Sequence, residues 1–201
     1  MVRKILFIGG SPCSGKSTVA ERLSQEYGAH YFKVDDLLGE LIKVSADRGC
    51  PVCASISAMS PDEIWLREPQ IQCDEEFFIY DELSEAVFER LCGISADFIV
   101  TEGAAFTPRI MAKRGITNYI AIVPTPDFQV SRYREREWVK FVLEGCSDKQ
   151  RAFDNWMKRD ILFAEQVKAE CEELGFPCIV NDGTRSRDEI FRIVQEFFQL
   201  R

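Results

Sequence analysis

Short apolar runs alternate with segments of helical periodicity along this chain. The runs predict strands at 5–8, 30–34, 98–101, 118–123 and 177–180. Between them apolar residues recur every three or four positions, as at Ile79, Leu83, Val87 and Leu91, which predicts amphipathic helices. Strands that alternate with helices form parallel sheets with right-handed crossovers. We therefore expect an α/β fold, a three-layer α/β/α sandwich around a five-stranded parallel sheet.

Two helix starts carry a clear local signal. Ser60 with Glu63, and Ser186 with Glu189, have the spacing of a capping box, and Pro61 suits a first helical position. Pro69 is expected to end the first of these two helices. In a later helix Phe153, Met157, Ile161, Ala164, Cys171 and Leu174 are expected to form the buried side.

The stretch at about 45–75 has the least regular pattern of the chain. It is rich in Cys, Pro and Ser near its start, and we interpret it as an insertion that covers a cleft and closes over a substrate. Trp65, Arg67 and Gln70 are candidate substrate contacts there, and a role as ordinary helix-face residues is equally open. With this insertion, residues 1–201 are expected to form a single domain.

A nine-residue segment directly after the first strand run matches the pattern G-x-x-x-x-G-K-[ST]. Its residues are Gly10, Ser11, Pro12, Cys13, Ser14, Gly15, Lys16, Ser17 and Thr18. The glycines let consecutive backbone N–H groups turn toward one phosphate, and the following helix adds the positive end of its dipole. Lys16 then places a cation against the β- and γ-phosphates, and the Ser17 hydroxyl is a ligand for Mg²⁺. The segment predicts a site for a nucleoside triphosphate.

Composition excludes several other classes of protein. The chain has 201 residues, 46% hydrophobic and 29% charged, which suits a globular domain. The formal net charge of -8 disfavours a nucleic-acid groove, because affinity for the phosphate backbone needs clustered Lys and Arg. The N-terminal apolar run is short and ends in the phosphate loop, so we expect no signal peptide, no membrane segment and a cytoplasmic location.

The eight cysteines are scattered, which favours reduced thiols over disulfides. Cys50 and Cys53 have the spacing of a zinc or redox pair, and Cys73 lies about twenty residues further on. Zinc needs a fourth ligand, and the only histidine is His30. Whether these thiols bind zinc therefore stays open. Cys13 lies inside the phosphate loop, where the loop dipoles could lower its pKa and make it oxidisable.

Acidic residues end two of the predicted strands. Asp35 and Asp36 follow the second strand, and Glu102 with Gly103 follows the third. Because the carboxyl ends of parallel strands share one edge, these carboxylates should lie near the phosphate loop. We expect one aspartate to face the cleft and contact a substrate and the other to cap the helix at 37–44. Glu102 is a candidate for holding Mg²⁺ or a substrate hydroxyl, the alternative being a structural contact to the loop.

Arginines follow the fourth strand. Arg132, Arg134 and Arg136 lie two residues apart in a segment that leaves a strand pointing at the nucleotide, and guanidinium groups bind phosphoryl oxygens bidentately. A second helix carries Arg151 and Arg159, and Arg109 is expected at the same rim as a substrate contact. After the fifth strand, Gly183 and Thr184 form a turn that can approach a nucleotide base through its backbone.

Together these motifs resemble the P-loop kinases of small molecules, the group that contains nucleoside monophosphate, shikimate, gluconate and uridine kinases. The resemblance covers most of the chain except about 45–75. It implies the sheet order 2-3-1-4-5, ATP and Mg²⁺ as cofactors, and adenine held by the turn at Gly183 and Thr184. It also implies a mobile lid at about 132–159, begun by Arg132 and Arg136 and ended by Arg159.

The chain departs from adenylate kinases, which carry an Asp-Gly-Phe-Pro-Arg run after the third strand. Here the run from Glu102 to Arg109 is longer, and Asp35 and Asp36 lead into Leu37. An acidic pair near the γ-phosphate suits a phosphoryl acceptor that carries a hydroxyl group, because an aspartate takes the hydroxyl proton in kinases of such acceptors. We therefore expect an enzyme, an ATP-dependent phosphotransferase for a small metabolite. A nucleoside monophosphate kinase, a nucleotide-dependent regulatory ATPase or switch, and a binding module without turnover are the alternatives.

Overall fold

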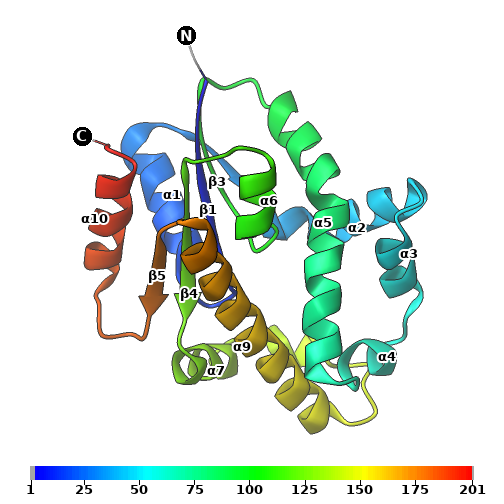
Figure 1. The fold of residues 1–201 in the computed structure, drawn as a ribbon. Coiled ribbons are helices and arrows are strands. Elements are labelled where there is room, and N and C mark those ends of the chain that lie inside the picture. The colour runs from blue at the N-terminus through cyan, green and yellow to red at the C-terminus, as the bar shows by residue number, and fades with distance from the viewer. Residues whose placement is uncertain (1–2, 201) are drawn as a thin grey trace.

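The computed structural model describes residues 3–200, and its centre is a parallel sheet (Figure 1). The strands are β1 (Lys4–Gly10), β2 (His30–Lys33), β3 (Phe98–Glu102), β4 (Tyr119–Pro124) and β5 (Cys178–Asn181). They lie in the order β2-β3-β1-β4-β5, and each neighbouring pair is parallel. The predicted five-stranded sheet and its strand order are confirmed.

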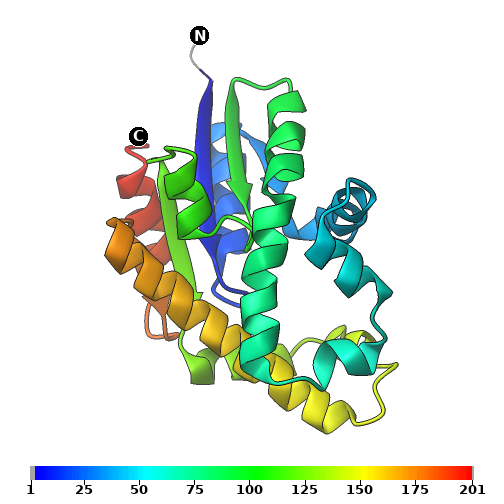
Figure 2. The ribbon, with the colours of Figure 1, turned by 45° about the vertical axis from the view of Figure 1, so that its right-hand side comes forward.

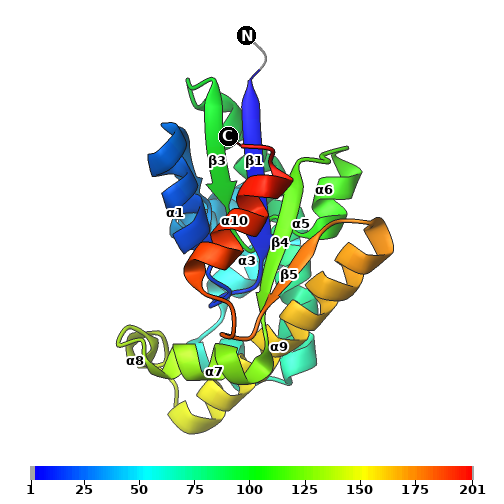
Figure 3. The ribbon, with the colours of Figure 1, turned by 90° about the vertical axis from the view of Figure 1, so that its left-hand side faces the viewer.

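Helices cover both faces of the sheet. One face carries α1 (Lys16–Tyr27) and α10 (Arg187–Phe197), and the other carries α5 (Pro69–Gly93), α6 (Pro108–Lys113) and α9 (Lys149–Leu174) (Figure 3). Each layer has its own apolar core, with Leu23 and Val194 on the first face and Leu83 and Phe163 on the second. The central strands β1 and β4 are buried on both faces, which explains their continuous apolar runs.

The stretch at 45–75 is more regular than its pattern predicts. It forms the end of α2 (Leu38–Asp47), then α3 (Pro51–Ala58), α4 (Pro61–Trp65) and the start of α5. The α2 and α3 helices pack against α5, and α4 packs against α9 (Figure 2). The capping box of Ser60 and Glu63 is confirmed.

Pro69 corrects the expected helix boundaries. The α4 helix ends at Trp65, and Pro69 occupies the first turn of α5. Proline has no N–H to donate, and the first turn of a helix needs none. The residue therefore starts a 25-residue helix, four residues beyond the end of α4.

Residues 126–159 form a smaller unit at the carboxyl edge of the sheet. It consists of α7 (Pro126–Arg134), α8 (Val139–Val142) and the start of α9, joined by short loops. Tyr133, Leu143 and Trp156 form a separate apolar cluster there, and Trp65 of α4 packs against it. The loop before α9 also docks on the start of α4, since the backbone N–H of Ser147 donates to Asp62 at 2.7 Å.

The long α9 helix buries a different stripe from the one expected. Met157, Ala164 and Cys171 are buried as predicted, but Phe153, Ile161 and Leu174 are only half-buried. The fully covered positions continue with Ala152, Trp156, Asp160, Phe163 and Val167. The helix crosses from the small unit to the sheet, so its buried face follows two different partners. No helix within residues 3–200 is long and apolar enough to span a membrane.

The glycine at position 9 is required by packing. A Cβ there would lie 2.5 Å from Cε2 of Tyr119, whose hydroxyl donates to the buried carbonyl of Phe106 at 2.8 Å. Gly9→Ala should therefore lower the free energy of unfolding by about 1–3 kcal/mol, the usual cost of overpacking a core. Gly39→Ala is the control, because Gly39 is exposed in α2 with open space around it. Urea unfolding that found both variants equally stable would contradict this packing constraint.

Candidate functional site

The loop between β1 and α1 has the backbone conformation of an anion cradle. Gly10, Cys13 and Gly15 have φ values of 118°, 62° and 96°, which turn the chain tightly before α1. The backbone N–H of Ser11 donates to the carbonyl of Ile122 at 3.2 Å and fixes the loop on β4. The α1 helix has no side-chain cap and no acidic residue in its first turn, so its N-terminal N–H groups remain available to an anion.

Two hydroxyl groups of this loop also suit the binding of an anion. Ser11 and Ser14 are buried, and their Oγ atoms have no hydrogen-bond partner among residues 3–200. A buried hydroxyl without a partner costs free energy unless a ligand or water supplies one. The loop therefore suits a phosphate group with several acceptor oxygens.

Lys16 is the charged centre of the site. Its Nζ lies 2.9 Å from Oδ2 of Asp35 and 3.6 Å from Oε2 of Glu102, and its side chain is only 6% exposed. Burial alone would lower the pKa of Lys16, but the charges of Asp35 and Glu102 outweigh it and raise the pKa. Lys16 thus stays a cation, held between the ends of β2 and β3.

Glu102 lies beneath the loop in a fully buried position. Burial raises the pKa of this carboxyl, while Lys16 lowers it and the hydrogen bonds from Tyr31 and Ser17 also lower it. The Tyr31 hydroxyl donates to Oε1 at 2.9 Å. Glu102 therefore lies beside Lys16 and is held by the Tyr31 hydroxyl.

Asp35 is fixed by its neighbours just after β3. It begins a 3₁₀ turn at Asp35–Leu37, and its Oδ1 accepts the N–H of Ala104, two residues after the end of β3, at 3.0 Å. A Cβ at Gly103 would lie 3.1 Å from that oxygen, so glycine permits the close approach. The expected capping role is wrong, because neither the turn nor α2 has a side-chain cap. Asp36 instead pairs with Lys33 at 2.7 Å.

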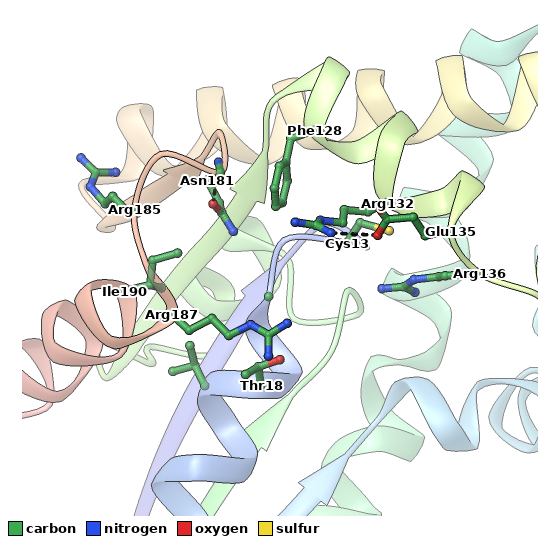
Figure 4. Close-up of a pocket in the computed structure, with 13 residues that line it drawn as sticks. Cys13, Thr18, Phe128, Arg132, Glu135, Arg136, Asn181, Arg185, Arg187 and Ile190 are labelled. Atoms are coloured by element: carbon green, nitrogen blue, oxygen red, sulfur yellow. Dashed lines mark hydrogen bonds and ion pairs between the residues drawn. The ribbon is translucent and has the colours of Figure 1, made fainter.

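Two cavities meet at this loop. The one toward the end of β5, called the β5-side cavity, has a volume of about 400 Å³. Figure 4 shows Phe128 and Arg132 on its α7 side and Arg187 and Ile190 on its α10 side. The Arg132 guanidinium lies 4.9 Å from the ring centre of Phe128 and pairs with Glu135 at 2.8 Å. This cavity offers a flat apolar face and several cations.

Asn181 connects the phosphate loop to the turn after β5, and both segments line the β5-side cavity. Its Nδ2 donates to the carbonyl of Ser14 at 2.9 Å, and its Oδ1 accepts the N–H of Gly183 at 3.1 Å. Gly183 has φ 86°, and a Cβ there would lie 2.8 Å from the Phe128 ring. Thr184 does not line this cavity, and its N–H and hydroxyl both donate to Asp182.

The second cavity, called the β2-side cavity, has a volume of about 630 Å³. Its lining includes Lys16, Asp35 and Asp36 together with the aromatic residues Trp65, Tyr133, Trp138 and Trp156. Four residues line both cavities: Cys13, Gly15, Thr18 and Arg136. A ligand in one cavity can therefore reach a ligand in the other across the phosphate loop.

A buried charge cluster closes the β2-side cavity. Arg159 contacts Glu76 at 3.0 Å through Nη1 and Asp160 at 2.6 Å through Nη2. Tyr80 donates to Glu76 and Tyr133 donates to Asp160, both at 2.6 Å. Burial raises the pKa of Glu76 and opposes the charge of Arg159. Each side chain of this cluster forms an ion pair or a hydrogen bond with another side chain of the cluster.

Comparisons with known proteins support the fold. No family model and no curated protein matches the sequence. Shikimate kinase from Bacteroides thetaiotaomicron is similar in structure, with a TM-score of 0.50 at 16% identity, covering 98% of this chain and 99% of that one. TT1252 from Thermus thermophilus has a TM-score of 0.53 at 17% identity, covering 99% and 98%. The chain has a P-loop kinase-like fold.

This fold brings most of the predicted site residues together. Loop residues 12–18, Asp35, Asp36, Arg136 and Arg159 line the β2-side cavity, and Arg132 and Gly183 line the β5-side cavity. Gly10, Ser11, Glu102 and Thr184 line neither cavity. Two predicted substrate contacts lie elsewhere. Arg67 pairs with Glu75 and lines a different cavity with Arg151 and Lys158. Arg109, expected at the rim, pairs with Glu170 and Glu173 of α9 and contributes to neither cavity at the loop.

Several cavity residues were not predicted as site residues. Phe128 and Asn181 in the β5-side cavity, and Glu76, Tyr133 and Trp156 in the β2-side cavity, come from helices and strand ends with ordinary patterns. Asn181 was detectable in principle, since a polar residue ends the fifth strand. The others have helical spacing that equally fits an apolar core.

The cysteines correct one expectation and leave another open. Burial raises the pKa of Cys13 to about 11, which outweighs the nearby cations, so the thiol stays protonated at neutral pH and the expected lowering is wrong. Burial also raises the pKa of Cys53 and of Cys73, each to about 12. Across residues 3–200 no group of three or more His, Cys, Asp or Glu side chains is arranged to hold a metal ion.

Asn181→Ala should weaken nucleotide binding, because it removes both hydrogen bonds that hold the loop against the Gly183 turn. We expect the Kd for ATP to rise about tenfold, equivalent to one lost hydrogen bond. Isothermal titration calorimetry measures this directly. Asn155→Ala is the control, since Asn155 donates to the carbonyls of Trp65 and Arg67 away from the loop. Equal losses in both variants would contradict a specific role for Asn181.

Proposed function

We propose that this protein is an ATP-dependent phosphotransferase that moves the γ-phosphoryl group to a hydroxyl of a small molecule. The observation that carries the proposal is the Lys16 and Asp35 pair, 2.9 Å apart in the lining of the β2-side cavity beside the phosphate loop. A cation beside the phosphate loop and a carboxylate facing a second cavity are the two groups that transfer to a hydroxyl requires.

The donor nucleotide fits the loop and the β5-side cavity. The phosphates would lie on the N–H groups of the loop and α1, and the base would lie against Phe128 and the Gly183 turn. Mg²⁺, when bound, neutralises charge on the phosphates. The Ser17 hydroxyl and Glu102, which contact each other, are the residues proposed to hold it, Glu102 through water since it is fully buried.

Asp35 is proposed to accept the proton of the attacking hydroxyl. Its Oδ1 accepts the N–H of Ala104 and its Oδ2 contacts Lys16, so the carboxylate is held in one orientation. Arg136 lines both cavities and is proposed to neutralise the equatorial oxygens of the transferred group together with Arg132. Arg159 is already bound by two carboxylates, so we assign it to the cavity wall.

The β2-side cavity favours an enzyme over a nucleotide-dependent switch. A switch needs a nucleotide site and a partner surface, whereas transfer needs a second enclosed space beside the γ-phosphate. A thermal-shift screen with Mg²⁺ and ATP plus nucleosides, monophosphates, sugars and hydroxy acids tests this, followed by assay of phosphoryl transfer. A compound that stabilises the protein and becomes phosphorylated supports the proposal. ATP binding with no response to any compound contradicts it.

Lys16→Ala should lower the rate of phosphoryl transfer by at least about 100-fold, because it removes the cation that faces the transferred charge. The variant should also be less stable by about 3 kcal/mol, since Glu102 is then buried without its partner. This loss should shrink as the pH falls. Without Lys16 the raised pKa of Glu102 rises further, and protonation removes its charge. Urea unfolding at pH 5 and pH 8 measures the difference.

The double variant Lys16→Ala, Glu102→Gln separates stability from chemistry. Neutralising Glu102 should restore most of the free energy of unfolding at pH 8, because no uncompensated carboxylate remains. The rate of phosphoryl transfer should stay low. Recovered transfer in the double variant would contradict a direct role for Lys16.

Asp35→Asn should lower kcat by about 100-fold or more and change the Kd for ATP by less than about threefold, since a general base acts on the acceptor. Steady-state kinetics and calorimetry measure the two quantities. Asp47→Asn, at the exposed end of α2, is the matched control. Equal losses of rate and of ATP affinity would assign Asp35 to the metal or phosphate site instead.

A further inference from the structure

The charges that line the β2-side cavity indicate which class of molecule accepts the phosphoryl group. This inference depends on the proposed function. Anionic acceptors such as phosphates and carboxylates need a cation that is free to pair with them. The cations that line this cavity are Lys16, Lys33, Arg136 and Arg159. An anionic acceptor could pair only with a cation of this set that has no carboxylate partner in the protein.

Three of these four cations already have carboxylate partners. Lys16 contacts Asp35 at 2.9 Å, and Lys33 contacts Asp36 at 2.7 Å. Arg159 lies between Glu76 at 3.0 Å and Asp160 at 2.6 Å, so its single positive charge is shared by two carboxylates. An anion placed beside Arg159 would meet both carboxylates.

Arg136 is the exception. It has no carboxylate partner within 4.0 Å among residues 3–200, and it lies beside the rings of Tyr133 and Trp138 at 5.7 and 5.6 Å. Because it lines both cavities, it faces the space between them, where the transferred phosphoryl group would lie. With Arg136 bound to the transferred phosphoryl group, none of the four cations is left unpaired to bind an anionic group of the acceptor.

Aromatic side chains line the same cavity, and the Arg159 guanidinium lies over one of them, 5.2 Å from the ring centre of Trp65. Trp65 and Trp156 pack with ring centres 4.8 Å apart, and Tyr133 meets Trp156 edge to face at 5.0 Å. Trp138 completes this aromatic lining at 6.0 Å from Trp156. Flat side chains of this kind favour a flat, uncharged ring, which they contact without desolvating a charge.

We infer that the acceptor is a hydroxyl compound of the nucleoside type, with a flat uncharged ring against the tryptophans and no phosphate or carboxylate group. The acceptor oxygen forms the new bond to the γ-phosphorus as the bond to the β,γ-bridging oxygen breaks. The electron pair of the broken bond leaves with ADP, and the hydroxyl proton passes to Asp35.

The three tryptophans of the chain provide a direct probe, because all of them line this cavity. Uridine, thymidine, cytidine, adenosine and guanosine are titrated against the full-length protein with Mg²⁺ and ADP, in parallel with their 5′-monophosphates. Tryptophan fluorescence, excited at the red edge of the band, reports binding. At least one nucleoside should bind with a Kd about tenfold or more below that of its monophosphate, and it should be phosphorylated when ATP replaces ADP.

Two results would overturn the inference. One is a monophosphate that binds as tightly as its nucleoside or becomes the better acceptor. The other is the absence of any fluorescence change with both sets. In either case the proposed function survives if another hydroxyl compound is phosphorylated in a reaction that Lys16→Ala abolishes. If no compound is phosphorylated and ATP turnover does not depend on Lys16, the proposed function fails as well.

Glu76→Gln tests the charge argument on its own. Glutamine has nearly the same shape and keeps a hydrogen-bond acceptor for Tyr80, but it removes one of the two carboxylates on Arg159. Affinity for monophosphates should rise about three- to tenfold relative to nucleosides. Glu75→Gln is the matched control, since the neighbouring Glu75 pairs with Arg67 outside this cavity. A nucleoside to monophosphate ratio that is unchanged in both variants would contradict the inference.

Discussion

The buried contact of Lys16 with Asp35 and Glu102 is the interaction on which the rest of the site depends. It joins the start of α1 to the ends of β2 and β3, three segments that are distant in sequence. A buried cation of this kind is stable only where carboxylates compensate the loss of hydration. The sheet supplies them because its parallel strands end at one edge, and the close packing at Gly103 places Asp35 at the right distance.

A second buried charge, Arg159, organises the other side of the site. It holds Glu76 of α5 and Asp160 of α9, and Tyr133 of α7 donates to Asp160. These contacts connect the segment at 126–159 to the layer on the sheet. The resemblance to P-loop kinases implied that Arg159 closes a lid over the phosphoryl group. Its two carboxylate partners favour a structural role in the wall of the β2-side cavity.

The two cavities differ in chemistry because different elements build them. The β5-side cavity collects arginines from α7 and the turn after β5, with only Glu135 to compensate them among its lining residues. The β2-side cavity combines four cations with carboxylates from the end of β2 and the start of α5, and its aromatic residues come from α4, α5, α7, α9 and the residue before α8. An anionic donor and an uncharged acceptor are the pair of ligands that this distribution of charge suits.

The sequence by itself determined the fold class, the phosphate loop and the carboxylates at the strand ends, because each depends on local spacing. Apolar periodicity, glycine positions and the alternation of strands with helices can be read within some thirty residues of chain, whereas the order of the strands in the sheet was expected only from the resemblance to a family. Only the tertiary structure decided the partners of Arg67, Arg109 and Arg159, since an arginine binds whichever carboxylate the packing brings near. The same holds for Trp65 and Trp156, whose helical spacing fits a core as well as a cavity wall, and only the crossing of α4 and α9 distinguishes the two.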